Sequence, residues 1–150
     1  NKAIRTVAVS EGSVGTLIKL DIRDLWFLTQ NTAGDIFVTT MEVVYRISYT
    51  EKTKTLIAGT PGIAGYRDSS HLNSLFYYPN ELIFIETNQL LIADLGSNKL
   101  RLLPLNKDRV TTLNLCNGCF SLDGPFSIML TNDSLYVGER RQILRFKCRL

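Results

Sequence analysis

Three cysteines and one histidine are the residues of this chain best suited to metal or redox chemistry: Cys116, Cys119, Cys148 and His71. A Cys-x-x-Cys pair is half of a zinc site or a redox motif, but neither Cys148 nor His71 stands in a second pair of suitable spacing. The Asn-Gly between the first two cysteines is turn chemistry, whereas a redox pair opens a helix. We therefore expect no metal and no cofactor. The spacing favours a disulfide from Cys148 to Cys116 or Cys119, with free thiols as the alternative.

A second group of candidate residues lies in a Gly/Pro-rich segment from residue 59 to residue 79. Its candidate contact residues are Tyr66, Arg67, His71, Tyr77 and Tyr78. Tyrosine and arginine are frequent anchors of protein interfaces, and loops carry binding residues more often than the elements they join. The segment therefore predicts a protein-binding surface. The alternative is that its aromatic side chains fill a seam between packed units.

The elements that must position these residues are short strands. Strand-like runs are Trp26–Leu28, Ile36–Val38, Val43–Tyr45, Leu82–Ile85, Leu90–Ile92 and Leu135–Val137. They are rich in β-branched, aromatic and aliphatic residues, and turn residues separate them at short intervals. No window keeps a helical spacing of apolar residues. The pattern predicts an all-β fold.

The strand pattern repeats along the chain. Three runs align as second strands of a repeated unit, Ile36–Thr40, Leu90–Asp94 and Leu135–Glu139, with starts 54 and 45 residues apart. An arginine follows each of them, and the chain opens with a similar segment, Asn1–Arg5, that matches Asn98–Arg101. A period of about 40–50 residues with about four strands is the size of a propeller blade.

At this point the chain resembles the NHL-repeat family of β-propellers. The matching segments are Gly65–Ser69, Ser74–Pro79, Leu91–Asp94, Asn98–Arg101 and Val110–Leu113. Ser69 and Ser74 stand where that family usually has glycine and alanine. A second resemblance, to YWTD-type propellers, rests on Leu135–Glu139 and Ile143–Arg145. The resemblance implies a propeller fragment of about three four-stranded NHL-like blades, belonging to a larger, six-bladed ring.

The repeat divides residues 1–150 into parts of blades. We expect the end of one blade over 1–19, a blade over 20–59, a blade with its long connector over 60–116, and an incomplete blade over 117–150. A propeller closes with four to eight blades, and an open ring leaves unpaired strand edges. We therefore expect the chain to require the rest of the propeller, or to associate with itself.

The simplest interpretation of the repeated charged residues is that they stabilise the fold. The set is Arg5, Arg46, Asp68, Asp94, Arg101, Glu139 and Arg145. An arginine can bridge the acid at the turn of its own blade, which predicts the pairs Asp94–Arg101 and Glu139–Arg145. Thr40 replaces that acid in the first unit, so Arg46 is expected to lack a partner. Asp68 is expected to accept hydrogen bonds within its loop.

The function these features favour is a non-catalytic module that binds a protein through the loop face between blades. One alternative is RNA binding, which some NHL propellers perform, with Lys99, Arg140 and Arg141 added to the surface. The net charge of +3 gives RNA little support. Another is a lyase or lactonase with a channel metal, completed by residues outside this chain. The sequence holds no Gly-x-Ser-x-Gly motif and no P-loop.

Two features bear on the compartment. Asn132-Asp133-Ser134 is an acceptor triplet for N-glycosylation in an expected turn. Together with the cysteines, it favours an extracellular or secretory setting. No run of about 18 apolar residues occurs, so no membrane insertion is expected.

Overall fold

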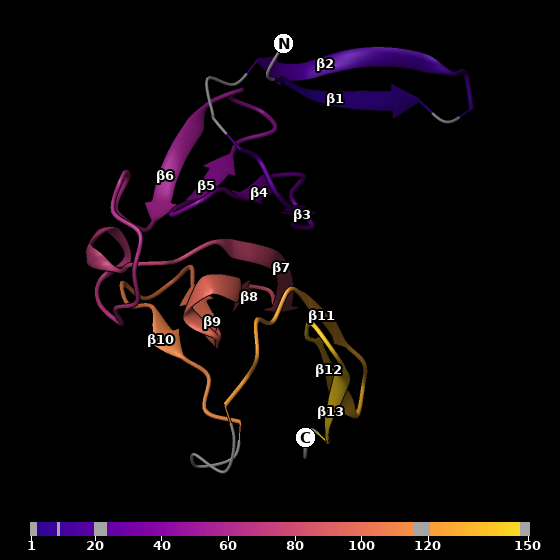
Figure 1. Ribbon diagram of the computed structural model, residues 1–150. Helices are drawn as coiled ribbons and strands as arrows, with labels where there is room; N and C mark the ends of the chain where they lie inside the picture. Colours follow the sequence, from indigo (N-terminus) through magenta and orange to yellow (C-terminus); the bar gives the residue numbers. More distant parts are fainter. Residues whose placement is uncertain (1–2, 9, 20–23, 116–120, 148–150) are drawn as a thin grey trace.

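The computed structural model describes residues 3–8, 10–19, 24–115 and 121–147 (Figure 1). Within these ranges the regular structure is strand, with two single 3-10 turns, η1 (His71–Asn73) and η2 (Leu95–Ser97). The strands are β1 (Ala3–Ala8), β2 (Ser13–Lys19), β3 (Leu28–Gln30), β4 (Ile36–Thr39), β5 (Val44–Ile47), β6 (Lys54–Ala58), β7 (Pro79–Glu86), β8 (Gln89–Asp94), β9 (Lys99–Pro104), β10 (Thr111–Thr112), β11 (Ser127–Leu130), β12 (Ser134–Gly138) and β13 (Ile143–Lys147). None of the helices in the described ranges is long and apolar enough to cross a membrane.

The strands form four small antiparallel sheets that follow one another around an arc (Figure 1). Strands β3 to β6 and β7 to β10 make two four-stranded sheets, β11 to β13 make a three-stranded sheet, and β1 and β2 make a hairpin. Strands that are neighbours in sequence are neighbours in each sheet, as short turns require. Strands β3, β7 and β11 lie on the inner side of the arc. The all-β class and the series of small propeller-type sheets are confirmed.

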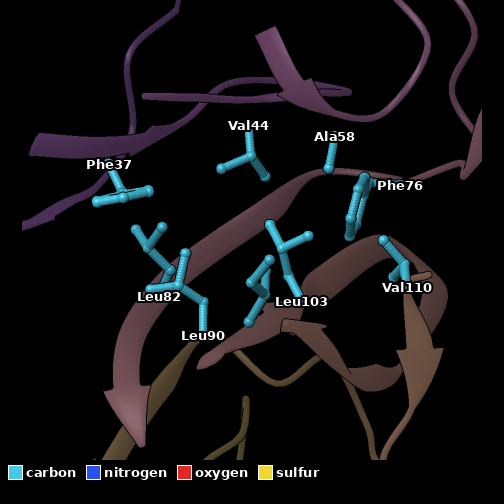
Figure 2. Packing of buried hydrophobic residues seen from close by; sticks show 9 residues of the cluster. Phe37, Val44, Ala58, Phe76, Leu82, Leu90, Leu103 and Val110 are labelled. Carbon is cyan, nitrogen blue, oxygen red and sulfur yellow. The ribbon is translucent and has the colours of Figure 1, made fainter. Parts of the chain in front are cut away.

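The largest apolar cluster lies between the two four-stranded sheets (Figure 2). Phe37, Val44 and Ala58 come from the first sheet, and Leu82 and Leu90 come from the second. All five are at most 1% exposed. Because burial of apolar surface contributes about 25 cal/mol per Å², this contact between neighbouring sheets stabilises their face-to-face packing.

The sheet of β7 to β10 is packed on both faces, which explains why β8 is apolar without alternation. Leu90 and Ile92 face the cluster shared with the preceding sheet. Leu91 and Ala93 belong to a second cluster, with Ile128 and other residues of the following sheet. Successive side chains of a strand point to opposite faces. A strand covered on both faces therefore reads as a continuous apolar run.

Polar contacts join the inner strand β7 to the sheets before and after it. The Thr39 hydroxyl donates to the Asn80 carbonyl at 2.7 Å. The Ile128 N–H, at the free edge of β11, donates to the carboxylate of Glu81 at 2.6 Å. An unpaired backbone N–H buried between sheets is costly. Glu81 therefore satisfies the edge of the next sheet and fixes its position relative to β7.

The first inner strand begins later than the sequence indicated. We predicted a strand over Trp26–Leu28, but β3 begins at Leu28. The backbone of Trp26 and Phe27 still pairs with Thr39, with N···O distances of 3.1 Å in both directions. Their side chains are each 42% exposed. The apolar run here therefore presents aromatic surface at the end of a sheet.

Candidate binding site

Loops from two successive sheets meet at one end of the inner strands. The Tyr78 N–H donates to the Met41 carbonyl, in the β4–β5 turn of the preceding sheet, at 3.0 Å. The Gly96 N–H, in the β8–β9 turn, donates to the Tyr77 carbonyl at 2.7 Å. The end of the long connector is thus held between two turns. The chain just before β3 reaches the same place, because Trp26 stacks on Tyr78.

Four exposed or half-buried aromatic residues gather there, and we call Trp26, Phe27, Tyr77 and Tyr78 the aromatic cluster. The rings of Trp26 and Tyr78 stack with centroids 5.8 Å apart, and those of Tyr77 and Tyr78 with centroids 4.8 Å apart. Trp26 and Tyr77 are each 42% exposed. Asp24, Leu25 and Met41 complete a shallow depression beside Trp26, Phe27 and Tyr78. Stacked aromatic rings with open faces suit a ligand that is itself flat or apolar on one side.

The backbone of the cluster is constrained. Tyr78 has φ of +54°, a left-handed conformation that costs a bulky L-residue free energy. Such strain persists only where the surroundings fix it, and it concentrates at ligand-binding sites. The Tyr77 N–H donates to Asp94 at 2.9 Å. A Cβ at Gly96 would lie 2.5 Å from the Tyr77 carbonyl oxygen, so only glycine admits this close approach.

The remaining connector residues of the expected surface lie elsewhere. The Tyr66 hydroxyl is 3.0 Å from the Thr112 hydroxyl on β10. Arg67 Nε donates to the Asn73 carbonyl at 2.8 Å, within the connector itself. Tyr66 and Arg67 are exposed, but they lie beside the outer strand of the sheet. The structure therefore separates them from Tyr77 and Tyr78.

His71 also lies apart from the aromatic cluster. Its N–H donates to Asp108 at 2.8 Å, and its ring Nδ1 is 3.7 Å from the same carboxylate oxygen. Its side chain is 17% exposed and lines a cleft of about 520 Å³ between the two four-stranded sheets, with Phe37 and Ile57. His71 thus contributes to a seam between sheets.

The basic residues of the expected surface lie at two different places, next to the β8–β9 turn and in the β12–β13 turn. Arg140 and Arg141 are exposed in the turn between β12 and β13. A Cβ added at Gly124 would lie 3.0 Å from Arg140 Nε and 3.2 Å from Leu95, which places Arg140 beside the β8–β9 turn. Lys99, which follows that turn, is half-buried and lines a second cleft with Tyr66.

Arg101 ties the connector to its sheet. It is fully buried, and its Nη1 donates to Asp94, the partner that the repeat predicts, at 2.9 Å. Its Nη2 donates to Asp68 at 2.8 Å, and the two nitrogens also bind the carbonyls of Leu75 and Arg67. A guanidinium with this many acceptors holds the connector at several points at once.

The rings around Arg101 extend the network. The guanidinium carbon lies 4.9 Å from the centre of the Tyr66 ring and 5.0 Å from that of Phe76. Burial raises the pKa of Asp94 to about 6, against the opposing effects of the Tyr77 N–H and Arg101. At neutral pH the carboxylate is therefore ionised. Asp94 links the buried arginine to the backbone of the aromatic cluster.

The expectation that Arg46 lacks an acidic partner is wrong. Its Nε donates to Asp35 at 2.9 Å, and Asp35 also accepts the Tyr49 N–H at 3.0 Å. Arg46 stands opposite Phe37 in the antiparallel pair, so its side chain reaches the residue just before β4. Its partner comes from the beginning of the second strand, whereas Thr40 stands at the end.

The expected Glu139–Arg145 pair is wrong for the same reason. Arg145 Nη2 lies 3.2 Å from Asp133, and Arg145 Nε donates to Ser134 at 2.9 Å. Both partners are at the beginning of β12. Glu139 instead accepts the Asp123 N–H at 2.8 Å, so it organises the chain before β11.

Protonation of Asp35 is expected to destabilise the fold. The hydrogen bond from Tyr49 and the contact with Arg46 hold the pKa of Asp35 below its usual value of 3.8, although burial opposes them. The unfolded chain therefore binds this proton at higher pH than the folded chain, and stability falls as pH drops below about 4. Asp35→Asn should flatten this part of the stability curve, measured by urea unfolding between pH 2.5 and 6. A variant whose curve keeps the wild-type slope would contradict the assignment.

The described part of the chain contains no group of side chains that could together bind a metal ion. Over residues 3–8, 10–19, 24–115 and 121–147, no three side chains of His, Cys, Asp and Glu gather closely enough to hold a metal ion. Cys116, Cys119 and Cys148 lie outside the described residues, and so does their expected disulfide.

Two other residues singled out from the sequence lie on the surface. Asn132 is exposed in the β11–β12 turn. Arg5 is exposed on β1.

Sequence reasoning missed Trp26, Phe27 and Asp35 as site or network residues. The aromatic pair was assigned to a strand because the apolar run continues through it. The available signal was that Trp26 and Phe27 precede the start of an inner strand, as Tyr77 and Tyr78 do in the next sheet. Asp35 could have been found from the antiparallel register, which aligns the beginning of one strand with the later part of the next.

Comparison with known proteins supports the fold. No family model and no curated protein matches the sequence. A solved protein of unknown function from Bacteroides thetaiotaomicron matches 98% of this chain and 42% of its own, with a TM-score of 0.84 and 16% identity. An auxiliary nutrient binding protein from Bacteroides ovatus matches 97% of this chain and 43% of its own, with a TM-score of 0.79 and 16% identity. Streptogramin B lyase matches 93% and 46%, with a TM-score of 0.58 and 13% identity.

These similarities define the class of fold and no more. The similar structures are propeller-type proteins, and at such low identity the likeness concerns architecture alone. The chain spans less than half the length of each of them. The fold is therefore that of a group of propeller-type blades, and the aromatic cluster lies at the end where their inner strands begin.

Proposed function

We propose that this chain is a non-catalytic binding module with NHL-like blades, and that it binds a protein partner through the aromatic cluster. The observation that carries the proposal is the exposed stack of Trp26, Tyr78 and Tyr77 on a strained backbone. Tryptophan and tyrosine dominate the binding energy of protein interfaces, since they bury a large area and lose little rotational freedom.

Several features support a preformed site. Tyr77 is fixed by Asp94 and Gly96, and Tyr78 is fixed by Met41. Rings held in place before binding lose less conformational entropy when a partner arrives. Asp24 at the rim adds an acidic group. A partner with an apolar or cationic side chain between polar residues would match this surface.

A second candidate is binding of a small nutrient molecule. The observation that favours it is the likeness to solved structures named auxiliary nutrient binding proteins, with TM-scores of 0.79 and 0.75. A sugar ring or an aromatic metabolite has a flat face that could lie on Trp26 or Tyr77. In that case the ligand would be small and the contact area correspondingly limited.

Trp26 is the only tryptophan of the chain, so its fluorescence reports directly on the site. Peptides selected from a display library on the intact chain, and a panel of oligosaccharides, amino acids and dipeptides, would each be titrated against its emission. We expect a peptide to shift the emission, and Tyr77→Ala to weaken that peptide by about 10- to 100-fold. A small ligand that shifts the emission while peptides do not would favour the second candidate.

Tyr49→Ala is the matched control. Tyr49 is 46% exposed, close to the 42% of Tyr77, but it lies in the turn after β5, outside the cluster. It should leave the affinity unchanged. Equal losses in the two variants, or ligands that leave Trp26 emission unaltered, would contradict a binding role for the aromatic cluster.

A further inference from the structure

The cleft between the two four-stranded sheets lies at the opposite end of the inner strands from the aromatic cluster. Its lining includes Asn31, in the β3–β4 turn, and Asn88, in the β7–β8 turn. The aromatic cluster lies instead beside the β4–β5 and β8–β9 turns. Successive turns of an antiparallel sheet lie at opposite ends, so the two places are separate. The volume of the cleft, about 520 Å³, is in the range of small-molecule sites.

The apolar part of the cleft is the margin of the cluster between the sheets. Phe37, from β4, belongs to that cluster, and Ile57 and Leu105 pack against it. All three line the cleft, and Ile57 and Leu105 remain partly exposed. An apolar side chain placed here would extend the cluster and remove this remaining apolar surface from water.

Arg46 brings a positive charge to the cleft from the first sheet. It stands opposite Phe37 in the β4–β5 pair, so both side chains leave the same face of the sheet. Its bonds to Asp35 use Nε and Nη2, and its side chain is 52% exposed. Arg101, at the matching position of the next sheet, is fully buried and binds four acceptors. Arg46 therefore keeps hydrogen-bonding capacity that Arg101 uses within the fold.

Asp108 brings a negative charge to the cleft from the loop between β9 and β10. Its side chain is 75% exposed, and it accepts the His71 N–H at 2.8 Å. This bond fixes the carboxylate relative to the connector without covering it. Lys107 and Arg109, the neighbours of Asp108 in sequence, line a different depression, together with Glu86. The cleft thus has a cation from one sheet, an anion from the other and apolar side chains at the seam.

We propose that this cleft binds a small zwitterion with an apolar side chain, either a free amino acid or a dipeptide. The carboxylate of the ligand pairs with Arg46, its ammonium group pairs with Asp108, and its side chain packs on Phe37, Ile57 and Leu105. A simple anion would meet the charge of Asp108, and a simple cation would meet the charge of Arg46, so the two walls together select a ligand that carries both charges. This inference is independent of the binding role of the aromatic cluster.

Amide NMR spectra of the intact chain would locate the site and measure the affinity. The probes are leucine, the dipeptide Leu-Leu, N-acetylleucine, which lacks the ammonium group, and leucinamide, which lacks the carboxylate. We expect leucine or Leu-Leu at millimolar concentration to shift the amides around the cleft and to leave the emission of Trp26 unchanged. The tighter of the two identifies the source of the zwitterion. Each blocked form of leucine should bind about 10-fold more weakly, because it loses one charge-assisted contact.

Variants of the two exposed charges test which group each wall recognises. Asp108→Asn should weaken leucine by about 10-fold and leave N-acetylleucine unchanged, whereas Arg46→Met should weaken leucine equally and leave leucinamide unchanged. Arg109→Met is the matched control, because Arg109 is exposed beside Asp108 but lines the other depression, and it should bind leucine as the wild type does.

Three results would overturn the proposal. The first is that neither leucine nor Leu-Leu shifts an amide around the cleft. The second is that each variant weakens leucine and its blocked forms by the same factor. The third is that the shifts are confined to the aromatic cluster, which would instead support the small-ligand candidate for that cluster.

Discussion

Replacing Arg101 with methionine will lower the free energy of unfolding by about 3–5 kcal/mol. The guanidinium is fully buried between Asp94 and Asp68. Methionine fills much of the volume but removes one charged donor from each of two carboxylates and two carbonyls. The charged form of Asp94 is destabilised most, because its side chain is fully buried and burial already raises its pKa to about 6. Urea unfolding followed by circular dichroism measures the change.

Arg46→Met is the matched control for that change. The residue occupies the same position of the repeat and pairs with a single acid, but its side chain is 52% exposed. Exposed ion pairs contribute little, so the cost should be about 0.2–1 kcal/mol. If both substitutions cost the same, the difference in burial would not govern the stability of the repeat.

The Arg101 variant should also disturb the aromatic cluster. Asp94 binds both Arg101 and the Tyr77 N–H, so loss of the guanidinium frees the carboxylate to move. We expect the emission of Trp26 to shift in the folded Arg101→Met protein and to stay unchanged in Arg46→Met. Emission that is identical in both would show that the cluster is held independently of the buried network.

Replacing Gly59 with alanine will lower the free energy of unfolding by about 2–4 kcal/mol. The residue has φ of +92°, and an added Cβ would lie 2.3 Å from the Glu42 carbonyl oxygen and 2.9 Å from the Val43 Cα. The left-handed backbone costs an L-residue roughly 1–2 kcal/mol, and overpacking against backbone atoms adds about 1–3 kcal/mol. Thermal and urea unfolding measure the sum.

Gly62→Ala separates these two causes. Gly62 has φ of +77°, in the same connector, but an added Cβ would meet no atom within 4 Å. It should therefore lose only the backbone contribution, about 1–2 kcal/mol. Equal losses of unfolding free energy at Gly59 and Gly62 would mean that the backbone near Gly59 shifts to make room for the added methyl group.

The strands were predictable from sequence because their signals are local. The runs Ile36–Val38, Leu82–Ile85, Leu90–Ile92 and Leu135–Val137 all lie within strands. Alternation, β-branched residues and turn chemistry act over a few residues, so each run could be recognised without knowledge of its neighbours. The repeat then indicated how many strands each sheet contains.

Ion-pair partners were predictable only in part. Asp94 and Arg101 were paired correctly by repeat position, whereas Arg46 and Arg145 were not. In an antiparallel pair, the direction in which a side chain leans decides which end of the neighbouring strand it reaches. That lean depends on the twist and packing of the sheet, so position in the repeat did not determine it.

The sequence by itself determined the class of this protein: an all-β chain of repeated four-stranded units with structural arginines. Only the tertiary structure decided where its candidate binding surface lies. The connector residues Tyr66, Arg67 and His71 were separated from Tyr77 and Tyr78, and Trp26 was brought onto Tyr78 from 52 residues away. The physical reason is that strand formation follows local patterns, whereas a surface forms where distant loops are held together by packed sheets and hydrogen bonds.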